Sequence, residues 1–248
     1  MSYQQFKPHP ALASYIDAYW TVVGEGTQSV SERILPDCCV DIIVNLGTNF
    51  VSDTTGFIMK NERAYLVGTM TRYKQTIREP DTHLLGIRFK PAAFGHFYPY
   101  GDLHEITDGI TEFDTRAIPP FSVLTKHFAE NLDHFFLNRF SATRNSIFPI
   151  IGEINRRMGK ISVFELAKNN YTTVRQLQRL FKLHMGIGPK DFINFVRYQF
   201  AVQTIRDSYA SKSLWDIAFD TGYYDHAHLT NEIKKHAGLV PSQIVHTW

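Results

Sequence analysis

One unit of sequence occurs twice in the carboxy-terminal third of the chain, and this duplication constrains the fold more than any single motif does. Between about residues 163 and 241, most equivalent positions lie 52 residues apart, with a slip of one residue near a turn. Leu177 matches Leu229, and Gly186 matches Gly238. Each copy has the apolar spacing of two short helices joined by a turn, which predicts two helix-turn-helix units.

The helix expected at residues 173–184 has two different faces. Its apolar side chains recur with helical spacing and should pack on a core: Leu177, Leu180, Phe181 and His184. Arg175, Arg179 and Lys182 share another face, which Gln178 borders. Arginine can bind guanine, glutamine can pair with adenine, and lysine can neutralise phosphate. Such a face is often only a solvated helix surface, but on the second helix of a helix-turn-helix it predicts contact with DNA.

The second copy, with its recognition helix expected at residues 225–236, offers weaker donors. Ala227 and Asn231 stand where the first copy has Arg175 and Arg179. We therefore expect the first unit to supply most of the base-specific binding energy and the second unit mainly to position the protein. The predicted DNA contacts of both units are Thr173, Arg175, Gln176, Gln178, Arg179, Lys182, Tyr224, His226, Ala227, Thr230, Asn231 and Lys234.

These residues resemble the DNA-binding domain of the AraC/XylS family of transcription regulators, over residues 147–248. The motifs that carry the resemblance are Glu165-Leu166-Ala167, the run from Thr173 to Lys182, Gly186 with Gly188-Pro189, Asp216-Ile217-Ala218, Gly222-Tyr223, His228-Leu229, and Gly238 with Pro241. The resemblance implies seven helices, with two helix-turn-helix units in adjacent major grooves. Between the units, the apolar residues that follow Pro189 have helical spacing, which predicts a linker helix at 189–208. Two positions depart from the pattern: Tyr171 replaces a turn glycine, and Asn231 replaces a frequent arginine.

Charge divides the chain in the same place. Residues 1–143 carry 12 basic and 16 acidic side chains, a net charge of −4, whereas residues 144–248 carry 14 and 8, a net charge of +6. Only the basic part is expected to touch a polyanion. The polar stretch 141–145 is the expected linker, so the predicted domains are 1–143 and 147–248.

Composition excludes several classes of protein. With 248 residues, 44% of them hydrophobic, the chain can bury two cores. No apolar run approaches the roughly 20 residues of a membrane helix, and the amino terminus has no apolar signal core, so a soluble cytoplasmic protein is expected. Cys38 and Cys39 are adjacent, which disfavours a disulfide and cannot complete a zinc site. Reduced, half-buried thiols are expected, with a thiol-sensing role as the alternative.

The first 115 residues alternate short apolar segments with turn signals, which predicts a barrel or sandwich. The expected strands are residues 19–23, 33–35, 40–46, 57–59, 65–68, 73–77 and 84–89. Helices are expected from Pro91 onward and over residues 121–139. Residues 35–47 and 85–92 resemble segments of the amino-terminal domain in one AraC-type subgroup, where glycine is usual at the position of Cys38. The resemblance implies a small cupin-like β-barrel, followed by helices, that senses a ligand or dimerises.

The expected fold class is therefore α+β: a cupin-like β-barrel with flanking helices, then an all-α domain. Polar residues within apolar strands are the candidate ligand-binding residues: Trp20, Asp37, Asp41, Arg72 and Arg88. A buried Arg88 needs a carboxylate, and either an aspartate of the chain or a ligand could supply it. His83, His96 and His104 are too scattered for a metal-dependent cupin, so no metal, cofactor or enzymatic activity is expected.

The sequence thus predicts a sequence-specific DNA-binding transcription regulator, controlled by a small ligand or by dimerisation. The alternative is a regulator without a small-molecule ligand, controlled by a protein partner. A DNA-repair enzyme that shares this unit would need more cysteines. Candidate partners are double-stranded DNA, RNA polymerase, a small effector and a second copy of the chain, but no membrane. The phenylalanine-rich helix at 121–139 could form a dimer surface or pack on its own barrel; an open pocket with polar groups would favour sensing.

Overall fold

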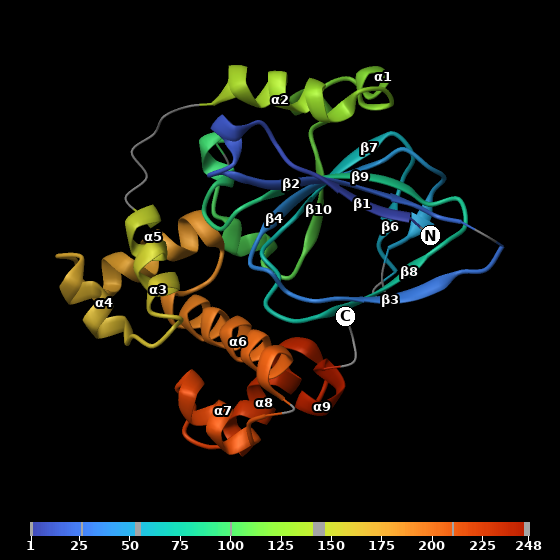
Figure 1. Ribbon diagram of the computed structural model, residues 1–248. Helices are drawn as coiled ribbons and strands as arrows, with labels where there is room; N and C mark the ends of the chain where they lie inside the picture. Colours follow the sequence, from blue (N-terminus) through green and yellow to red (C-terminus); the bar gives the residue numbers. More distant parts are fainter. Residues whose placement is uncertain are drawn as a thin grey trace.

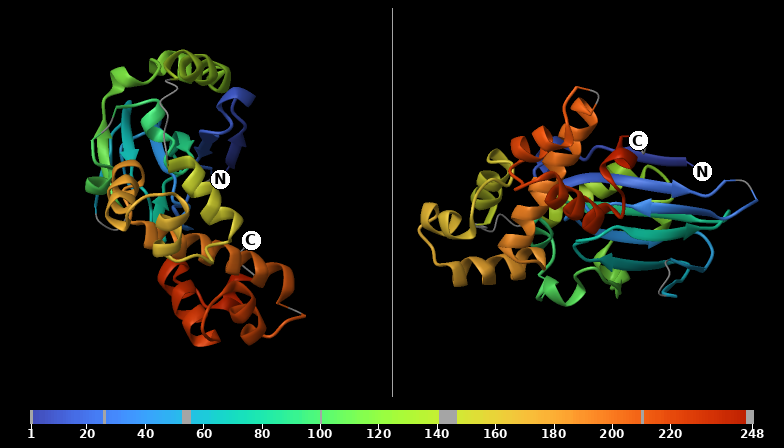
Figure 2. Two further views of the ribbon diagram at one scale, coloured as in Figure 1. Left: turned by 90° about the vertical axis from the view of Figure 1, so that its left-hand side faces the viewer. Right: turned by 90° about the horizontal axis from the view of Figure 1, so that it is seen from below.

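The computed structural model describes residues 2–25, 27–52, 56–99, 101–140, 147–209 and 211–245. Strands dominate residues 2–140, called the sheet domain below, and helices make up residues 147–245, called the helical domain. The two domains lie side by side, with the helices gathered along one side of the strands (Figures 1 and 2). The expected linker at 141–145 lies outside the described residues. Within those ranges, no helix is both long and apolar enough to cross a membrane.

A six-stranded antiparallel sheet forms the centre of the sheet domain, in the order β1-β2-β9-β4-β7-β10. Its strands are β1 (Ser2–Phe6), β2 (Ile16–Val23), β9 (His83–Phe89), β4 (Val40–Asn45), β7 (Arg63–Val67) and β10 (Ile110–Phe113). Successive side chains of a strand point to opposite faces of a sheet. Tyr19 therefore joins the core on one face and Trp20 the apolar cluster on the other.

Two strand pairs complete the domain. β3 (Val30–Ile34) pairs with β8 (Lys74–Arg78), and β5 (Phe50–Val51) pairs with β6 (Ile58–Met59). The described strands form these three separate sheets, and β1 and β10 remain the edges of the largest. The closed cupin-like barrel is thus not confirmed, although a strand-rich amino-terminal domain before a helical one is.

The expected helix at 121–139 is split in two, α1 (Phe121–Leu124) and α2 (Phe128–Arg139). His127, just before α2, has a φ of 48°, a left-handed conformation that a continuous helix cannot contain. Phe136 is fully buried, and its ring stacks 6.4 Å from that of Tyr19. The phenylalanine-rich helix therefore packs on the sheet of its own domain, which is one of the two alternatives that the sequence left open.

No helix begins at Pro91. Ala92 has a φ of 66°, so the chain turns there before a short 3-10 helix, η2 (Phe94–His96). Three other 3-10 helices are η1 (Pro10–Leu12), η3 (Leu103–Ile106) and η4 (Thr115–Ala117).

The helical domain follows the expected order closely. Its helices are α3 (Ile147–Arg156), α4 (Val163–Asn169), α5 (Val174–Met185), α6 (Pro189–Ser208), α7 (Leu214–Thr221), α8 (His226–Ala237) and α9 (Pro241–Ile244). Their apolar faces meet in one core around α6. Ser162 and Ser213 cap the first helices of the two units, each in a reciprocal bond with an acidic residue three positions later.

Candidate nucleic-acid interface and ligand pocket

Helix α5 is the second helix of the first unit and the expected recognition helix. Thr173 caps it: its hydroxyl accepts from the backbone N–H of Gln176, and the Gln176 side-chain oxygen accepts from the Thr173 N–H, each at 3.1 Å. Two predicted contact residues thus also start the helix. Tyr171, in the turn, adopts a φ of 50° and is 99% exposed, so the turn accepts the side chain, as expected.

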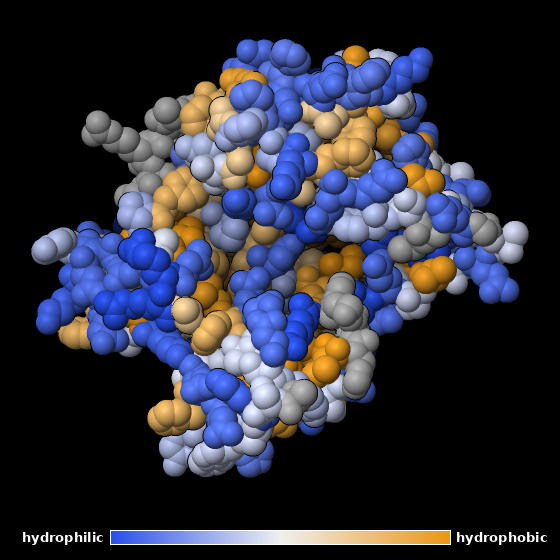
Figure 3. Space-filling view, viewed as in Figure 1, coloured by the Kyte–Doolittle hydropathy of each residue, from blue (hydrophilic) through white to orange (hydrophobic). Residues whose placement is uncertain are grey.

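Burial on α5 separates a packing face from a free face. Leu177 and Phe181 are fully buried, whereas Arg175, Arg179 and Lys182 are exposed. Within the ranges that the structure describes, none of these three cations has an ion-pair partner. Hydrophilic surface covers the region of α4 and α5 (Figure 3). The first unit therefore presents two arginines and a lysine to solvent, free to bind an anionic ligand.

Helix α8 has the same architecture with a poorer outer face. Asp225 caps it by accepting from His228 N–H at 2.7 Å, and Leu229 and Ile233 are fully buried. Its exposed positions include Ala227 and Asn231. The remaining predicted contacts are also placed on or beside α8: Tyr224, 90% exposed, and His226, Thr230 and Lys234.

The sequence analysis missed Trp215, on α7. It is 58% exposed, and its ring centroid lies 5.9 Å from that of His226, at the start of α8. Phe164 occupies the equivalent position on α4 of the first unit and is 72% exposed. An aromatic residue at the same position of both copies was the signal that could have identified this pair.

Helix α6 holds the two units at a set separation. Its 20 residues extend about 30 Å at the usual rise per residue. Arg197 on α6 donates from Nε and Nη2 to the carbonyl of Gly159, at 3.1 and 2.9 Å. This bidentate contact fixes the end of the α3–α4 loop on the linker helix.

A pocket of about 450 Å³ lies in the sheet domain, between the large sheet and the β3–β8 pair. Figure 3 shows an apolar hollow in this region. Most of its lining is apolar, with Trp20 on the sheet side. Gly86 leaves room for the indole, because a Cβ there would lie only 1.9 Å from a ring carbon of Trp20. The volume suits a small molecule.

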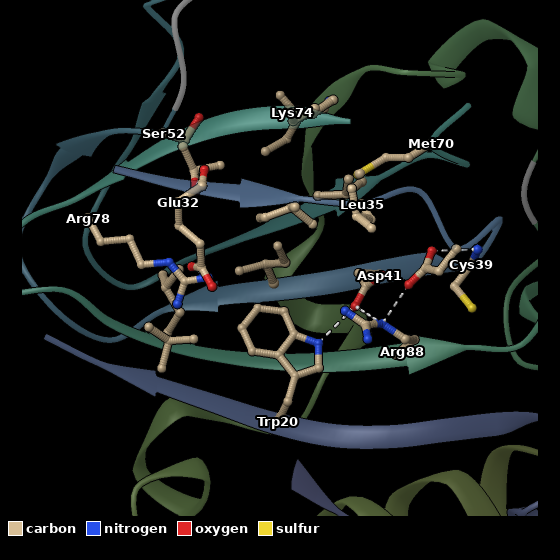
Figure 4. A pocket seen from close by; sticks show the side chains of 18 of the residues that line it. Trp20, Glu32, Leu35, Cys39, Asp41, Ser52, Met70, Lys74, Arg78 and Arg88 are labelled. Carbon is tan, nitrogen blue, oxygen red and sulfur yellow. Dashed lines mark hydrogen bonds and ion pairs between the residues drawn. The ribbon is translucent and has the colours of Figure 1, made fainter. Parts of the chain in front are cut away.

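Four of the five predicted ligand residues line this pocket: Trp20, Asp37, Asp41 and Arg88. Arg88 Nε lies 3.1 Å from Asp37 Oδ2 and 3.3 Å from Asp41 Oδ1. The Trp20 indole donates to the same Asp41 oxygen at 2.8 Å (Figure 4). Arg88 thus takes its carboxylates from the chain itself. Arg72, the fifth predicted residue, is exposed and does not line the pocket. It lies in the bend before β8 and not in a strand.

Burial governs the titration of this network. It raises the pKa of Asp41 to about 6, against the opposing effects of Arg88 and the Trp20 hydrogen bond. Burial alone would lower the pKa of Arg88, but the two carboxylates outweigh it and hold that pKa above its ordinary value. The two carboxylates therefore already neutralise the Arg88 guanidinium before any ligand binds.

The β3–β8 pair supplies a second charged group, which the sequence analysis missed. Lys74 and Arg78 of β8 line the pocket, and Arg78 Nη2 lies 2.5 Å from Glu32 on β3. Among the described residues, Nη1 of Arg78 is buried without a hydrogen-bond partner, and Lys74 has no ion pair. In Figure 4, Arg78 and Glu32 lie on one side of Trp20, and Asp41 and Arg88 lie on the other side. The signal was the alternation Lys74, Thr76, Arg78 along one strand.

Cys38 and Cys39 are free thiols, both more buried than expected. Burial raises the pKa of each thiol, which disfavours the reactive thiolate. Cys38 has a φ of 56°, which explains why glycine suits its position. No group of three or more potential metal ligands occurs within the described residues.

Comparison with known families assigns the two parts of the chain separately. Residues 166–246 match the family described as "Helix-turn-helix domain". Residues 4–112 match a domain of unknown function, DUF6597. The HTH-type transcriptional regulator CdhR of Pseudomonas aeruginosa is 26% identical over 106 residues, 42% of this chain. The matched segment spans only 31% of that relative.

Among solved structures, ToxT of Vibrio cholerae O395 bound to (E)-4-(8-methylnaphthalen-1-yl)but-3-enoic acid aligns over 99% of both chains, with a TM-score of 0.50 and 9% identity. A transcriptional regulator with an AraC-type DNA-binding domain from Chromobacterium violaceum is 24% identical over 40% of this chain and 90% of its own, with a TM-score of 0.36. The ToxT alignment is a similarity of fold that includes both domains.

Proposed function

We propose that this chain is a DNA-binding transcription regulator of the AraC type, that it reads a specific site mainly through its first helix-turn-helix, and that a small ligand in the sheet domain controls it. The observation that carries the DNA-binding proposal is the exposed face of α5. Arg175 and Arg179 stand one helical turn apart, exposed and without an ion-pair partner in the described chain. Two such arginines can read base edges, with Lys182 on a phosphate.

The test is a selection of binding sites from random DNA duplexes with the full-length protein, followed by titrations on the selected site. We expect Arg175→Ala to weaken binding by about 1–3 kcal/mol and to relax the preference at one base pair. Arg116→Ala is the matched control, since that arginine is exposed on the sheet domain, away from α5. Selection without any sequence preference would refute specific reading.

The pocket supports control by a small molecule, in preference to the alternative of a protein partner alone. Its volume of about 450 Å³ suits such a ligand, and charged groups converge on it from both sheets. The arrangement of an antiparallel sheet faced by β3 and β8 also supports an open relative of the cupin-like barrel. Binding, and not catalysis, is the role we propose for these residues.

The charges of the pocket favour an acid with an apolar body. Arg88 is neutralised by two aspartates. Strand β8 brings two cations to the pocket, Lys74 and Arg78, and of these only Arg78 is paired within the described residues, with Glu32. This group therefore keeps one net positive charge, and Nη1 of Arg78 is buried without a hydrogen-bond partner in the described chain. An acid group could bind on this cationic side of the pocket, while its apolar part covers Trp20. The ligand bound to ToxT is itself an acid with a naphthalene ring.

That arylbutenoic acid and its primary amide form a suitable pair of probes. Titration followed by tryptophan fluorescence should show tighter binding of the acid, and Lys74→Gln with Arg78→Gln should abolish this preference. Arg63→Gln is the control, because Arg63 is a half-exposed cation of β7 outside the pocket lining. Equal binding of acid and amide by the unmodified protein would refute an acidic ligand.

A further inference from the structure

The sheet domain touches both recognition helices at the same place, their carboxy-terminal ends. Helix ends leave backbone carbonyls without partners inside the helix. Here residues of the sheet domain bond to those carbonyls on α5 and on α8. The faces that carry Arg175, Arg179 and Asn231 stay exposed, so the contact holds the helices without covering their outer surface.

At the end of α5, two hydroxyls and an imidazole meet the last carbonyls. Thr69 Oγ1 donates to the Met185 carbonyl at 2.6 Å, and Thr107 Oγ1 donates to the Gly186 carbonyl at 2.8 Å. His104 Nδ1 lies 2.8 Å from the same Gly186 oxygen, so it donates there. Three donors of the sheet domain thus close the first recognition helix.

At the end of α8, the bonds run in both directions. The backbone N–H of Tyr73 donates to the His236 carbonyl at 2.8 Å. His236 is 4% exposed, and its Nδ1 lies 2.7 Å from the carbonyl of Thr71, to which it donates. Arg33 Nη1 adds a longer contact to the Ala237 carbonyl, at 3.4 Å.

The glycines that end the two helices also press against the sheet domain. A Cβ on Gly186 would lie 2.7 Å from the Leu103 carbonyl, and one on Gly238 would lie 2.3 Å from the Tyr73 ring. Both glycines adopt a positive φ, of 76° and 67°. The two ends therefore approach the sheet domain as closely as backbone allows.

One short segment serves both helices and the pocket. Residues Gly68–Lys74, called the strap below, alternate in their contacts. Gly68, Met70 and Lys74 line the pocket. Thr69 bonds to the end of α5, while Thr71 and Tyr73 bond to the end of α8. Because Thr69 and Tyr73 are four residues apart, the strap joins the two ends across at most about 14 Å of chain.

The strap is also anchored to its own domain. Asp108 accepts from the Thr71 N–H and from the Thr71 hydroxyl, each at 2.6 Å, and its own N–H donates to the Thr69 carbonyl at 3.0 Å. A displacement of the strap at Met70 would therefore move Thr69 and Thr71 together.

We propose that the strap couples the wall of the ligand pocket to both recognition helices at once and so adjusts the relative placement that α6 allows them. This inference rests on the proposed function, since it explains how occupancy of the pocket would reach the DNA-binding faces. DNA that spans two successive major grooves demands a defined separation of two recognition helices. A ligand that shifts the strap by filling the pocket would thereby change how both helices fit their DNA site.

Two methionines of the pocket provide a matched test. Met70, on the strap, and Met59, on β6, are both buried and both line the pocket. The backbone amides of Gly186 and Gly238 each close the last turn of a recognition helix, and their hydrogen exchange can be followed by NMR in the full-length protein. Met70→Ala should speed exchange at both amides by about fivefold or more, the effect of one net hydrogen bond. Met59→Ala should leave both rates within a factor of about two.

Thr69→Val separates coupling from two independent contacts. The variant keeps the shape of the side chain but removes the hydroxyl that bonds to α5. Coupling through the strap requires faster exchange at Gly238, on the other helix, as well as at Gly186. Thr125→Val is the control, since the Thr125 hydroxyl donates to the Ser122 carbonyl of α1 and, within the described residues, makes no hydrogen bond to the helical domain. Exchange that changes at Gly186 alone, or equally for Met70→Ala and Met59→Ala, would overturn the proposal.

These measurements need neither DNA nor ligand. Failure of the exchange test therefore refutes the strap while leaving the DNA titrations unaffected. Failure of the DNA titrations would in turn refute the proposed function without altering the exchange result.

Discussion

The two helix-turn-helix units have the same scaffold and different outer faces. In both, a serine caps the first helix, a 12-residue recognition helix follows, and a glycine with positive φ ends it. Arg175 and Arg179 are exposed in the first unit, where the second exposes Ala227 and Asn231. Buried positions thus preserve the unit while exposed positions are free to diverge. The difference teaches that duplication of a fold need not duplicate its exposed surface, on which function depends.

The largest effect should come from the shared core and should be equal in the two units. Leu177 and Leu229 are both fully buried. Leu177→Ala and Leu229→Ala should each lower the free energy of unfolding by about 2–5 kcal/mol, through lost apolar contacts and a residual cavity. Denaturant titration measures both. A cost below about 1 kcal/mol in either unit would show that its core is not the structural equivalent of the other.

The next effect should be unequal. Arg179→Ala should cost about 1–3 kcal/mol of binding to a selected site, because a bidentate contact to guanine is lost. Asn231→Ala should cost clearly less, since the short amide has little reach. Both are compared in titrations at one salt concentration, with Asn231→Arg as a gain-of-contact variant. Equal losses from Arg179→Ala and Asn231→Ala would refute the asymmetry of the two units.

The helix caps should again behave alike. Ser162 and Ser213 each accept from the backbone three residues later, at 3.1 and 3.2 Å. Ser162→Ala and Ser213→Ala should each cost about 1 kcal/mol of unfolding free energy and leave the base preference unchanged. Ser242→Ala, at an exposed serine of α9, is the control. A change in base preference would show that a cap also reads DNA.

The smallest effect should come from the turn inside each unit, where the two units have different residues in the same left-handed conformation. Tyr171 and Gly222 occupy equivalent turns with φ of 50° and 81°. Gly222→Ala should lower stability by about 1 kcal/mol, because a Cβ is disfavoured in the left-handed region. Tyr171→Gly should change it by less than about 1 kcal/mol, since relief of strain opposes greater freedom of the unfolded chain. Thermal unfolding measures both, and a large loss for Tyr171→Gly would reveal a contact made by the exposed ring.

The helical domain was predictable because its signals are local. A proline at the first position and regular apolar spacing predicted a helix over 189–208, and α6 spans Pro189–Ser208. The buried residues Leu229 and Ile233 of α8 show the same helical spacing. Where local backbone conformation overrides the pattern, prediction failed: the left-handed Ala92 and His127 interrupt the two helices expected in the sheet domain.

The pocket was only partly predictable, because its walls come from distant segments. Trp20, Asp41 and Arg88 stood out as polar groups in apolar strands, and they meet in the structure. Arg78 acquires its role only through the pairing of β8 with β3, which begins 44 positions earlier in the chain. Arg72 has the same charge but sits before β8, outside the pairing. The register of β3 and β8 is needed to tell that Arg78 lines the pocket and that Arg72 does not.

The glycines that end α5 and α8 lie against the sheet domain, and this has a consequence for how the recognised DNA site could be changed. Gly186 and Gly238 lie at the end of each helix that faces the sheet domain, whereas Arg175 and Ala227 lie near the opposite end. Substitutions that alter the recognised site therefore need not touch the surface through which the domains communicate. If the proposed ligand control holds, a designer, or natural drift, could exchange the recognised DNA site while the response to the ligand is inherited intact.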